Sequence, residues 1–145
     1  MTYALDTNTI SFLLRPGRNP QVVQKFEDII KQGSDYVIPP LCHYEINWYL
    51  QRKKATAQLQ VFSDLYNDSL KNLIMDEADF VLAAKIKADL VEKGTPIGNK
   101  DADIFITAYC INNDYTLVTN NVDDFQRIDG LKYINFYEAS NRDGR

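Results

Sequence analysis

The sequence contains few residues that form disulfides or bind zinc. Its 145 residues include two cysteines, Cys42 and Cys110, and one histidine, His43. The cysteines lie far apart in apolar stretches and belong to no CxxC or Cys/His ligand pattern, which argues against a zinc site or a disulfide framework. We expect both to be buried thiols in a reducing compartment.

Long apolar segments are also absent. No stretch approaches the ~20 apolar residues of a membrane span, and the N-terminus lacks a basic region followed by an apolar one. We therefore expect a cytoplasmic protein with no membrane insertion. No repeat, linker or low-complexity segment divides the chain, so residues 1–139 are predicted to form a single domain and residues 140–145 a disordered polar tail.

The positive charge typical of nucleic-acid-binding proteins is missing as well. The net charge is −4 and the pI is near 4.9, although carboxylates that hold a cation count as negative in such a sum. Basic side chains remain at Arg15, Arg18, Arg52, Lys53 and Lys100. These are the candidates for contacts with RNA, and a solvated helix face is the alternative for the pair at 52–53.

Short apolar runs alternate with longer segments of helical spacing. Strands are expected at residues 2–5, 36–38, 73–75, 115–118 and 132–136, and helices at 20–31, 41–53, 56–70, 77–93 and 104–111. This alternation predicts a three-layer α/β fold, in which helices cover both faces of a largely parallel sheet. Ligand sites in such sheets form at the carboxyl ends of the strands, where the strand order reverses.

Three acidic residues are candidates for a site at that edge. Asp6 directly follows the first strand, although it could simply cap a helix that begins there. Glu45 lies among apolar residues early in its helix, either on a narrow polar stripe or half-buried for a functional reason. Asp103 precedes a segment that is apolar on nearly all sides, which favours an interior position. Either Asp103 or Asp101 could instead be the N-cap of that helix.

Polar groups that could assist these acids lie close to them in the sequence. They are Asp101, Thr7, Asn8, Thr119, Asn121 and Asp124. Unpaired carboxylates in one crevice repel one another and lose hydration, and a divalent cation removes this conflict. Oxygen ligands suit Mg²⁺ or Mn²⁺. The chemistry that follows is hydrolysis of a phosphodiester by metal-activated water.

A set of short motifs extends along nearly the whole chain. They are Leu-Asp-Thr-Asn-Thr at 5–9, the loop at 15–20, the segment 38–46, Lys-Gly-Thr-Pro-Ile-Gly at 93–98, Asp-Ile-Phe-Ile-Thr-Ala at 103–108, and Leu-Val-Thr-Asn-Asn at 117–121 with Phe125 and Gly130-Leu131 behind it. In this order they resemble the PIN-domain ribonucleases, and within these the VapC-type toxins of bacterial type II toxin–antitoxin systems. No single motif is diagnostic, but the ordered set is a strong match.

The resemblance implies that Asp6 and Asp103 bind metal, with Glu45 as a third acid that binds it directly or through water. It also implies structured RNA such as tRNA or rRNA as substrate, a homodimer, and a cognate VapB-type antitoxin over the site. Asn121 replaces the family's fourth acid, which leaves open whether one metal or two are bound. Asp103 is preferred to Asp101 because its distance along the chain to Asn121 fits the family pattern.

Two other functions stay open. A phosphotransferase would use Asp6 as its nucleophile, but Asn8 stands where such enzymes usually carry a second acid. A non-catalytic interaction module would account for the acidic pI and for Asn121, and a metal titration without effect on stability would favour it. His43, two residues before Glu45, is expected to be structural rather than catalytic.

Overall fold

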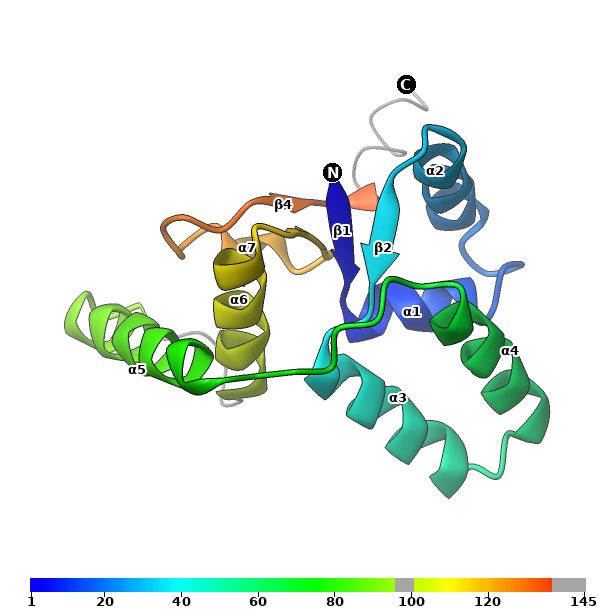
Figure 1. The fold of residues 1–145 in the computed structure, drawn as a ribbon, viewed down its shortest axis with the longest axis horizontal. Coiled ribbons are helices and arrows are strands. Elements are labelled where there is room, and N and C mark those ends of the chain that lie inside the picture. The colour runs from blue at the N-terminus through cyan, green and yellow to red at the C-terminus, as the bar shows by residue number, and fades with distance from the viewer. Residues whose placement is uncertain (96–100, 137–145) are drawn as a thin grey trace.

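A computed structural model of the protein describes residues 1–95 and 101–136 (Figure 1). One parallel sheet contains β1 (Thr2–Leu5), β2 (Asp35–Val37), β3 (Thr116–Val118) and β4 (Tyr133–Ile134), in the order β2-β1-β3-β4. Strand predictions at 2–5, 36–38, 115–118 and 132–136 are confirmed in position, with shorter or shifted bounds.

Helices connect the strands on both sides of the sheet. They are α1 (Thr7–Leu13), α2 (Pro20–Lys31), α3 (Pro40–Arg52), α4 (Thr56–Asn67), α5 (Glu77–Glu92), α6 (Asp101–Asn113) and α7 (Val122–Phe125). The chain passes from β1 to β2 in one direction and then back past β1 to β3. Because such crossovers are right-handed, the two sets of helices cover opposite faces. The predicted α/β architecture is confirmed.

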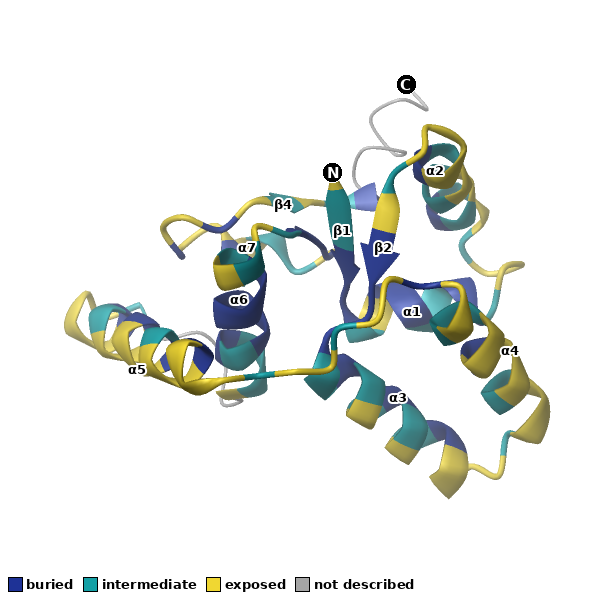
Figure 2. Cartoon of the chain, in the orientation of Figure 1, coloured by how far each residue is buried: buried dark blue, intermediate teal, exposed yellow. Residues whose placement is uncertain are grey.

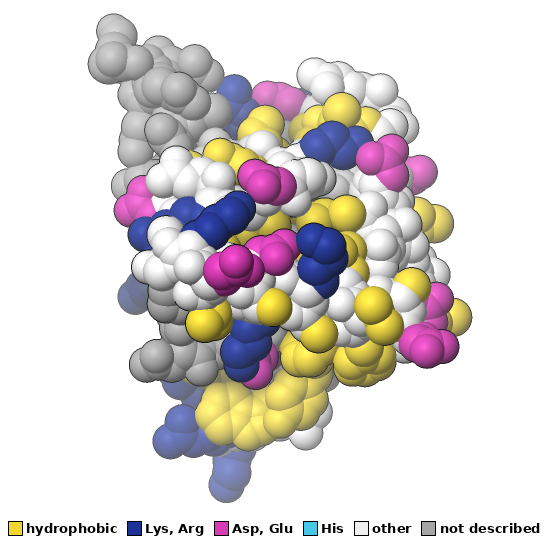
Figure 3. All heavy atoms as spheres, turned by 90° about the vertical axis from the view of Figure 1, so that its left-hand side faces the viewer, with side chains coloured by type: hydrophobic (Ala, Val, Ile, Leu, Met, Phe, Trp, Pro, Cys, Tyr) yellow, Lys and Arg dark blue, Asp and Glu magenta, His cyan; other side chains and the backbone are white. Residues whose placement is uncertain are grey.

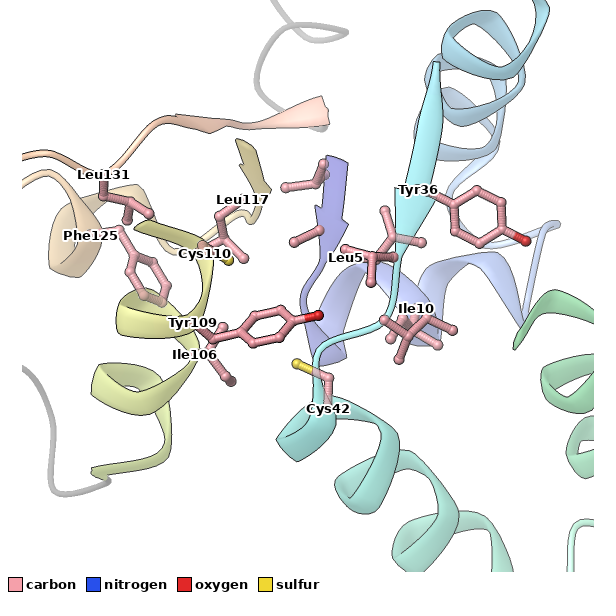
Figure 4. Packing of buried hydrophobic residues seen from close by; sticks show 14 of the residues in the cluster. Leu5, Ile10, Tyr36, Cys42, Ile106, Tyr109, Cys110, Leu117, Phe125 and Leu131 are labelled. Carbon is pink, nitrogen blue, oxygen red and sulfur yellow. The ribbon is translucent and has the colours of Figure 1, made fainter. Parts of the chain in front are cut away.

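The core surrounds the central strands and includes buried residues of α6 and of α1 to α4. Figure 2 shows the carboxyl-terminal parts of β1 and β2 and the middle of α6 as buried, whereas much of α5 is exposed. In Figure 4, Tyr109 and Cys110 of α6 point towards the strands, and Cys42 lies at the start of α3. Both cysteines are free and buried, and this burial raises the pKa of each thiol. The prediction of buried thiols is confirmed.

Within the described part of the chain, no helix has both the length and the apolar character that crossing a bilayer requires.

The strand predicted at residues 73–75 is wrong. Leu70 alone pairs with the sheet, through an isolated parallel bridge to Val37. Beyond it the side chains of Leu73 and Ile74 are 41% and 73% exposed. These β-forming residues therefore gain little by joining the sheet, because strand preference depends mainly on packing against a half-buried surface.

Asn72 fixes this irregular segment to the end of α6. Its side-chain amide donates to Asn113 Oδ1 at 3.2 Å and to the Tyr115 hydroxyl at 3.1 Å. We expect Asn72→Ala to lower the free energy of unfolding by about 1–2 kcal/mol, because both bonds are lost. Urea denaturation measures this change. Asn67→Ala, at the exposed end of α4, is the control and should change it by less than about 0.5 kcal/mol; equal effects would contradict the anchoring role of Asn72.

The sequence patterns do not predict the short helices α1 and α7. Each is too short for a helical period of apolar residues to be recognised. In addition, α6 begins at Asp101 rather than at residue 104. This earlier start places both Asp101 and Asp103 in its first turn.

The carboxyl ends of β1 and β3 mark the point at which the strand order reverses. The Asp6 N–H donates to the Val118 carbonyl at 3.2 Å, and the Thr9 hydroxyl donates to the same oxygen at 3.2 Å. These bonds hold the segments that follow the two strands side by side. Open parallel sheets form their ligand sites at such a position.

Candidate active site

Asp6 both caps a helix and faces a cavity. Its Oδ1 accepts a hydrogen bond from the Thr9 N–H at 2.8 Å, which makes it the N-cap of α1. The residue is 8% exposed. Burial raises the pKa of its carboxyl, hydrogen bonds from Thr119 and Thr9 oppose that rise, and the charge of nearby Glu45 adds to it. The two interpretations of Asp6, helix cap and site acid, are therefore compatible.

Glu45 is held from across the site by α1. It lies in the second turn of α3, which begins at Pro40 directly after β2. Its side chain is half-buried, and its Oε1 accepts a hydrogen bond from the Thr7 hydroxyl at 2.8 Å. This bond fixes the carboxylate near Asp6, even though the two acids come from different connections of the sheet.

Of the two aspartates in the first turn of α6, one faces the same cavity as Asp6 and Glu45. Asp103 is half-buried and lines a cavity together with Asp6 and Glu45. Asp101 points elsewhere: its carboxylate is 57% exposed and pairs with Lys87 of α5 at 3.0 Å. The placement therefore favours Asp103 over Asp101 as the site acid.

These three acids line what we term the acidic hollow, a cavity of about 210 Å³ at the carboxyl edge of the sheet. Its lining residues are Asp6, Thr7, Asn8, Glu45, Asp103, Ile106, Asn121 and Phe125. Three carboxylates, one hydroxyl and two amides thus face a single space between α1, α3 and α6. The volume and the polar lining of this cavity suit a single side chain or phosphate group rather than a large apolar ligand.

The remaining auxiliary candidates lie beside the acidic hollow. The Thr119 hydroxyl accepts a hydrogen bond from the Asn121 N–H at 3.0 Å. The Asn121 side-chain amide donates to Asp124 Oδ2 at 2.9 Å, and Asp124 Oδ1 lies 3.9 Å from Arg127. Asp124 is therefore a partner of Asn121 and not a lining residue.

The donor set of the acidic hollow fits a hard divalent cation. It offers only oxygen and amide groups, and the burial of Asp6 makes a neutralising charge favourable. Within residues 1–95 and 101–136, no group of three or more His, Cys, Asp or Glu side chains is arranged so that it could hold a metal ion as it stands. Mg²⁺ commonly keeps several of its waters, so carboxylates can also hold it through water.

His43 lies outside the acidic hollow. Its ring packs against Phe62 at 5.5 Å and Tyr66 at 4.7 Å between ring centroids, on the side of α4. Burial lowers its pKa. The ring therefore has a packing role, as the sequence position predicts.

A second, larger cavity adjoins the acidic hollow, and we term it the aromatic hollow. It has a volume of about 570 Å³ and is lined by Thr7, Asn8, Ser11, Phe12, Arg15, Arg18, Asn19, Tyr44, Glu45, Ile46, Trp48 and Tyr49. The sequence indicates Arg15 and Arg18 as basic candidates but does not single out Tyr44. The signal for Tyr44 is its spacing from Trp48, which places two aromatic side chains on one face of α3.

The predicted RNA-binding residues are only partly gathered here. Arg15 and Arg18 line the aromatic hollow. Arg52 and Lys53 lie at the end of α3, with their charged groups 5.6 Å and 4.5 Å from the ring centroids of Trp48 and Tyr49. Lys100 lies outside the described residues, as does the predicted tail at 140–145.

Comparison with known proteins gives one family and a shared fold. The family described as PIN domain matches residues 3–131. The chain is 25% identical over 131 residues to "Ribonuclease VapC2" of Rickettsia felis, a match that covers 90% of this chain and 95% of that protein. It is 24% identical over 132 residues to the "tRNA(fMet)-specific endonuclease VapC" of Salmonella typhimurium, covering 91% and 96% of the two chains.

Solved structures show the same fold. VapBC2 from Rickettsia felis, bound to a DNA fragment from its promoter, superposes with a TM-score of 0.77 at 23% identity, over 93% of this chain and 98% of that one. FitAcB from Neisseria gonorrhoeae superposes with a TM-score of 0.76 at 24% identity and the same coverage. At this level of identity the likeness concerns the fold.

Proposed function

Because the chain belongs to the PIN domain family, we propose that it is a divalent-metal-dependent endoribonuclease, the toxin of a type II toxin–antitoxin pair. The observation that carries this proposal is the acidic hollow, where Asp6, Glu45 and Asp103 converge from three different elements. The relatives named ribonuclease VapC support it over 90% of the chain. The proposed substrate is structured RNA such as tRNA or rRNA, and one relative is named for tRNA(fMet).

Asp6, Glu45 and Asp103 would hold Mg²⁺ or Mn²⁺, directly or through water. When bound, such an ion activates a water molecule, orients the scissile phosphate and stabilises charge on the leaving oxygen. The protein fixes its acids in advance, since Asp6 accepts from the Thr9 N–H and Glu45 from the Thr7 hydroxyl. Such preorganisation avoids the cost of reorienting charged groups during the reaction.

The first test is cleavage of a total-RNA pool by the purified, antitoxin-free protein with Mg²⁺ or Mn²⁺. We expect discrete fragments that disappear when EDTA is added. A folded sample that cleaves no RNA with either metal would overturn the proposal. The phosphotransferase alternative would instead be revived by a phosphoaspartate trapped at Asp6.

Metal binding can be measured independently of RNA cleavage, through its effect on the stability of the protein. A ligand that binds only the folded state raises the free energy of unfolding, by about 2.7 kcal/mol at a hundred times its dissociation constant. We expect Mn²⁺ or Mg²⁺ to raise the unfolding temperature of the protein, measured by calorimetry, whereas the same concentration of K⁺ should not. No shift with either divalent ion would favour the non-catalytic interaction module.

We also propose that the protein forms a homodimer through the exposed apolar side chains around α5. Ile74, Phe80 and Val81 are 73%, 52% and 63% exposed. Figure 3, which views the molecule from the side of α5, shows hydrophobic side chains set between charged ones on this face. Interfaces between two copies of one protein are more apolar than ordinary protein surface.

Val81→Glu tests the dimer. A charge buried between two copies without a partner is strongly unfavourable, so the variant should be monomeric at concentrations where the unchanged protein is a dimer. Sedimentation velocity measures the mass directly. Val61→Glu, at a 48% exposed position of α4, is the matched control. If both variants or neither lost the dimer, the surface around α5 would be the wrong one.

The remaining partner in the proposal is a VapB-type antitoxin. Structural neighbours of this chain are complexes named VapBC and FitAcB. We propose that a cognate antitoxin covers the acidic hollow and blocks cleavage. The proposed place of action is the cytoplasm, where the RNA substrate and the antitoxin are both made.

A further inference from the structure

We infer that the aromatic hollow is a subsite for one unpaired nucleotide of the RNA, next to the bond that is cut. Its base stacks on Trp48 or Tyr44, and its phosphate meets Arg15 or Arg18. The inference rests on the proposed RNA cleavage and adds a requirement on the substrate. The cut bond must adjoin a nucleotide that is free of base pairing.

The two hollows adjoin, because Thr7, Asn8 and Glu45 line both of them. A nucleotide next to a scissile phosphate in the acidic hollow is therefore placed beside the aromatic hollow. The volumes of about 210 Å³ and 570 Å³ match this division between a phosphate group and a larger unit.

The aromatic side chains are presented for stacking. Tyr44 and Trp48 lie one helical turn apart on α3 and are 64% and 53% exposed. Arg52 continues the same row and lies 5.6 Å from the Trp48 ring centroid. In Figure 3, Lys and Arg side chains adjoin a broad group of hydrophobic ones at the lower end, where α3 ends in Figure 1. Aromatic and guanidinium planes of this kind are the platforms on which unpaired bases stack.

The charges favour an anionic ligand at one end of the aromatic hollow. Arg15 and Arg18 line it, and the Arg18 N–H donates to the Arg15 carbonyl at 3.0 Å in the turn between α1 and α2. Tyr49 has a lowered pKa, through hydrogen bonding to Lys53 and, to a smaller extent, to Arg15. Glu45 is the one carboxylate among the described lining residues, and it belongs to the end shared with the acidic hollow.

Intrinsic fluorescence gives a direct test, because Trp48 is the only tryptophan in the sequence. The unchanged protein in EDTA, which prevents cleavage, is titrated with a short single-stranded oligoribonucleotide and with a duplex of the same sequence. We expect saturable quenching by the single strand and none by the duplex. Absence of quenching, or equal quenching by both, would overturn the inference whether or not the protein cleaves RNA.

Two substitutions distinguish the contribution of base stacking to RNA binding from the contribution of phosphate charge. Tyr44→Ala should weaken binding of the single strand roughly 5- to 100-fold, the range for loss of one stacked base. Arg18→Ala should lower the slope of log affinity against log salt by about 0.7, as for one phosphate contact on a single strand. Val61→Ala and Lys31→Ala are the matched controls, at exposed positions away from the aromatic hollow. Tyr44→Ala binding as tightly as these controls would contradict the stacking role.

Cleavage kinetics distinguish this subsite from a groove for the antitoxin. Trp48→Ala should raise KM roughly 5- to 100-fold with little change in kcat, because one stacked base is lost, and Trp48→Phe should restore most of it. If Trp48→Ala weakened antitoxin binding but left KM unchanged, the aromatic hollow would be a protein-binding groove and the inference would fail. Quenching by RNA without any cleavage would instead count against the proposed nuclease function alone.

Discussion

Asp6→Asn should abolish RNA cleavage, with a loss of at least about 100-fold, and yet leave the protein folded. The loss is expected because the carboxylate is a proposed metal ligand, and even residues behind such ligands contribute 10–100-fold. The fold should persist because an asparagine Oδ1 can still accept the Thr9 N–H and cap α1. In EDTA the variant should unfold at the same or a higher temperature than the unchanged protein.

The stability part of this prediction follows from the cost of burying a charge. Burial opposes ionisation of Asp6 and raises its pKa, and the charge of Glu45 adds to the effect. A neutral amide removes both contributions when no metal compensates them. Initial cleavage rates and calorimetry in EDTA measure the two parts, with Asp129→Asn at an exposed position as control. A marked fall in unfolding temperature would show that lost activity reflects unfolding, and retained cleavage would exclude Asp6 as a metal ligand.

Asp103→Asn and Asp101→Asn form a matched pair with opposite expected results. Asp103 lines the acidic hollow, so its amide variant should lose cleavage by about 100-fold or more and should no longer be stabilised by Mn²⁺. Asp101 pairs with Lys87 through side chains that are 57% and 55% exposed. Its variant should keep its cleavage rate and lose no more than about 1 kcal/mol of stability, as is usual for surface pairs.

Both substitutions replace a carboxylate with an amide of the same shape on the same helical turn, and the unfolding temperature of each variant in EDTA shows whether folding differs. RNA cleavage and the Mn²⁺-induced rise in unfolding temperature are measured for each. If Asp101→Asn were the more damaging variant in both assays, Asp103 would be the wrong choice. The acidic hollow would then have to include the surface next to α5.

The sheet could be predicted from the sequence because its central strands are short apolar runs bounded by polar residues. In the observed sheet Ala4, Leu5, Leu117 and Val118 are at most 1% exposed, which is the burial such runs indicate. The same pattern misleads at residues 73–75, because an apolar triplet does not show whether a neighbouring strand has room for it. Only the packed chain decides that Leu70 pairs and that Ile74 remains exposed.

The choice between Asp101 and Asp103 shows why the site needed the structure. An α-helix turns by about 100° per residue, so side chains two positions apart point in widely different directions. Which of them faces the sheet depends on where the helix begins and on how it packs. The apolar pattern starts at Ile104, which hides the observed start at Asp101. Family spacing favours Asp103, and the packed helix places the same residue in the acidic hollow.

The aromatic hollow could not be predicted for a different reason. Aromatic residues on an amphipathic helix are found both in cores and on surfaces, and their spacing alone does not separate the two. On α3 both occur together, since Tyr49 is half-buried whereas Tyr44 is 64% exposed. The contribution of Arg18 depends on the turn between α1 and α2, which no periodic pattern describes.

The residues that line the acidic hollow are far apart in the sequence, and this determines when the cavity can form during synthesis. Its lining extends from Asp6 to Phe125, and the Asp6 N–H donates a hydrogen bond to the Val118 carbonyl of β3. A ribosome must therefore complete most of the chain before these groups can meet. Truncated products that end before residue 103 contain Asp6 and Glu45 but have no third carboxylate and no β3. Interrupted translation thus yields fragments without the proposed nuclease site, which is complete only once synthesis of the chain is almost finished.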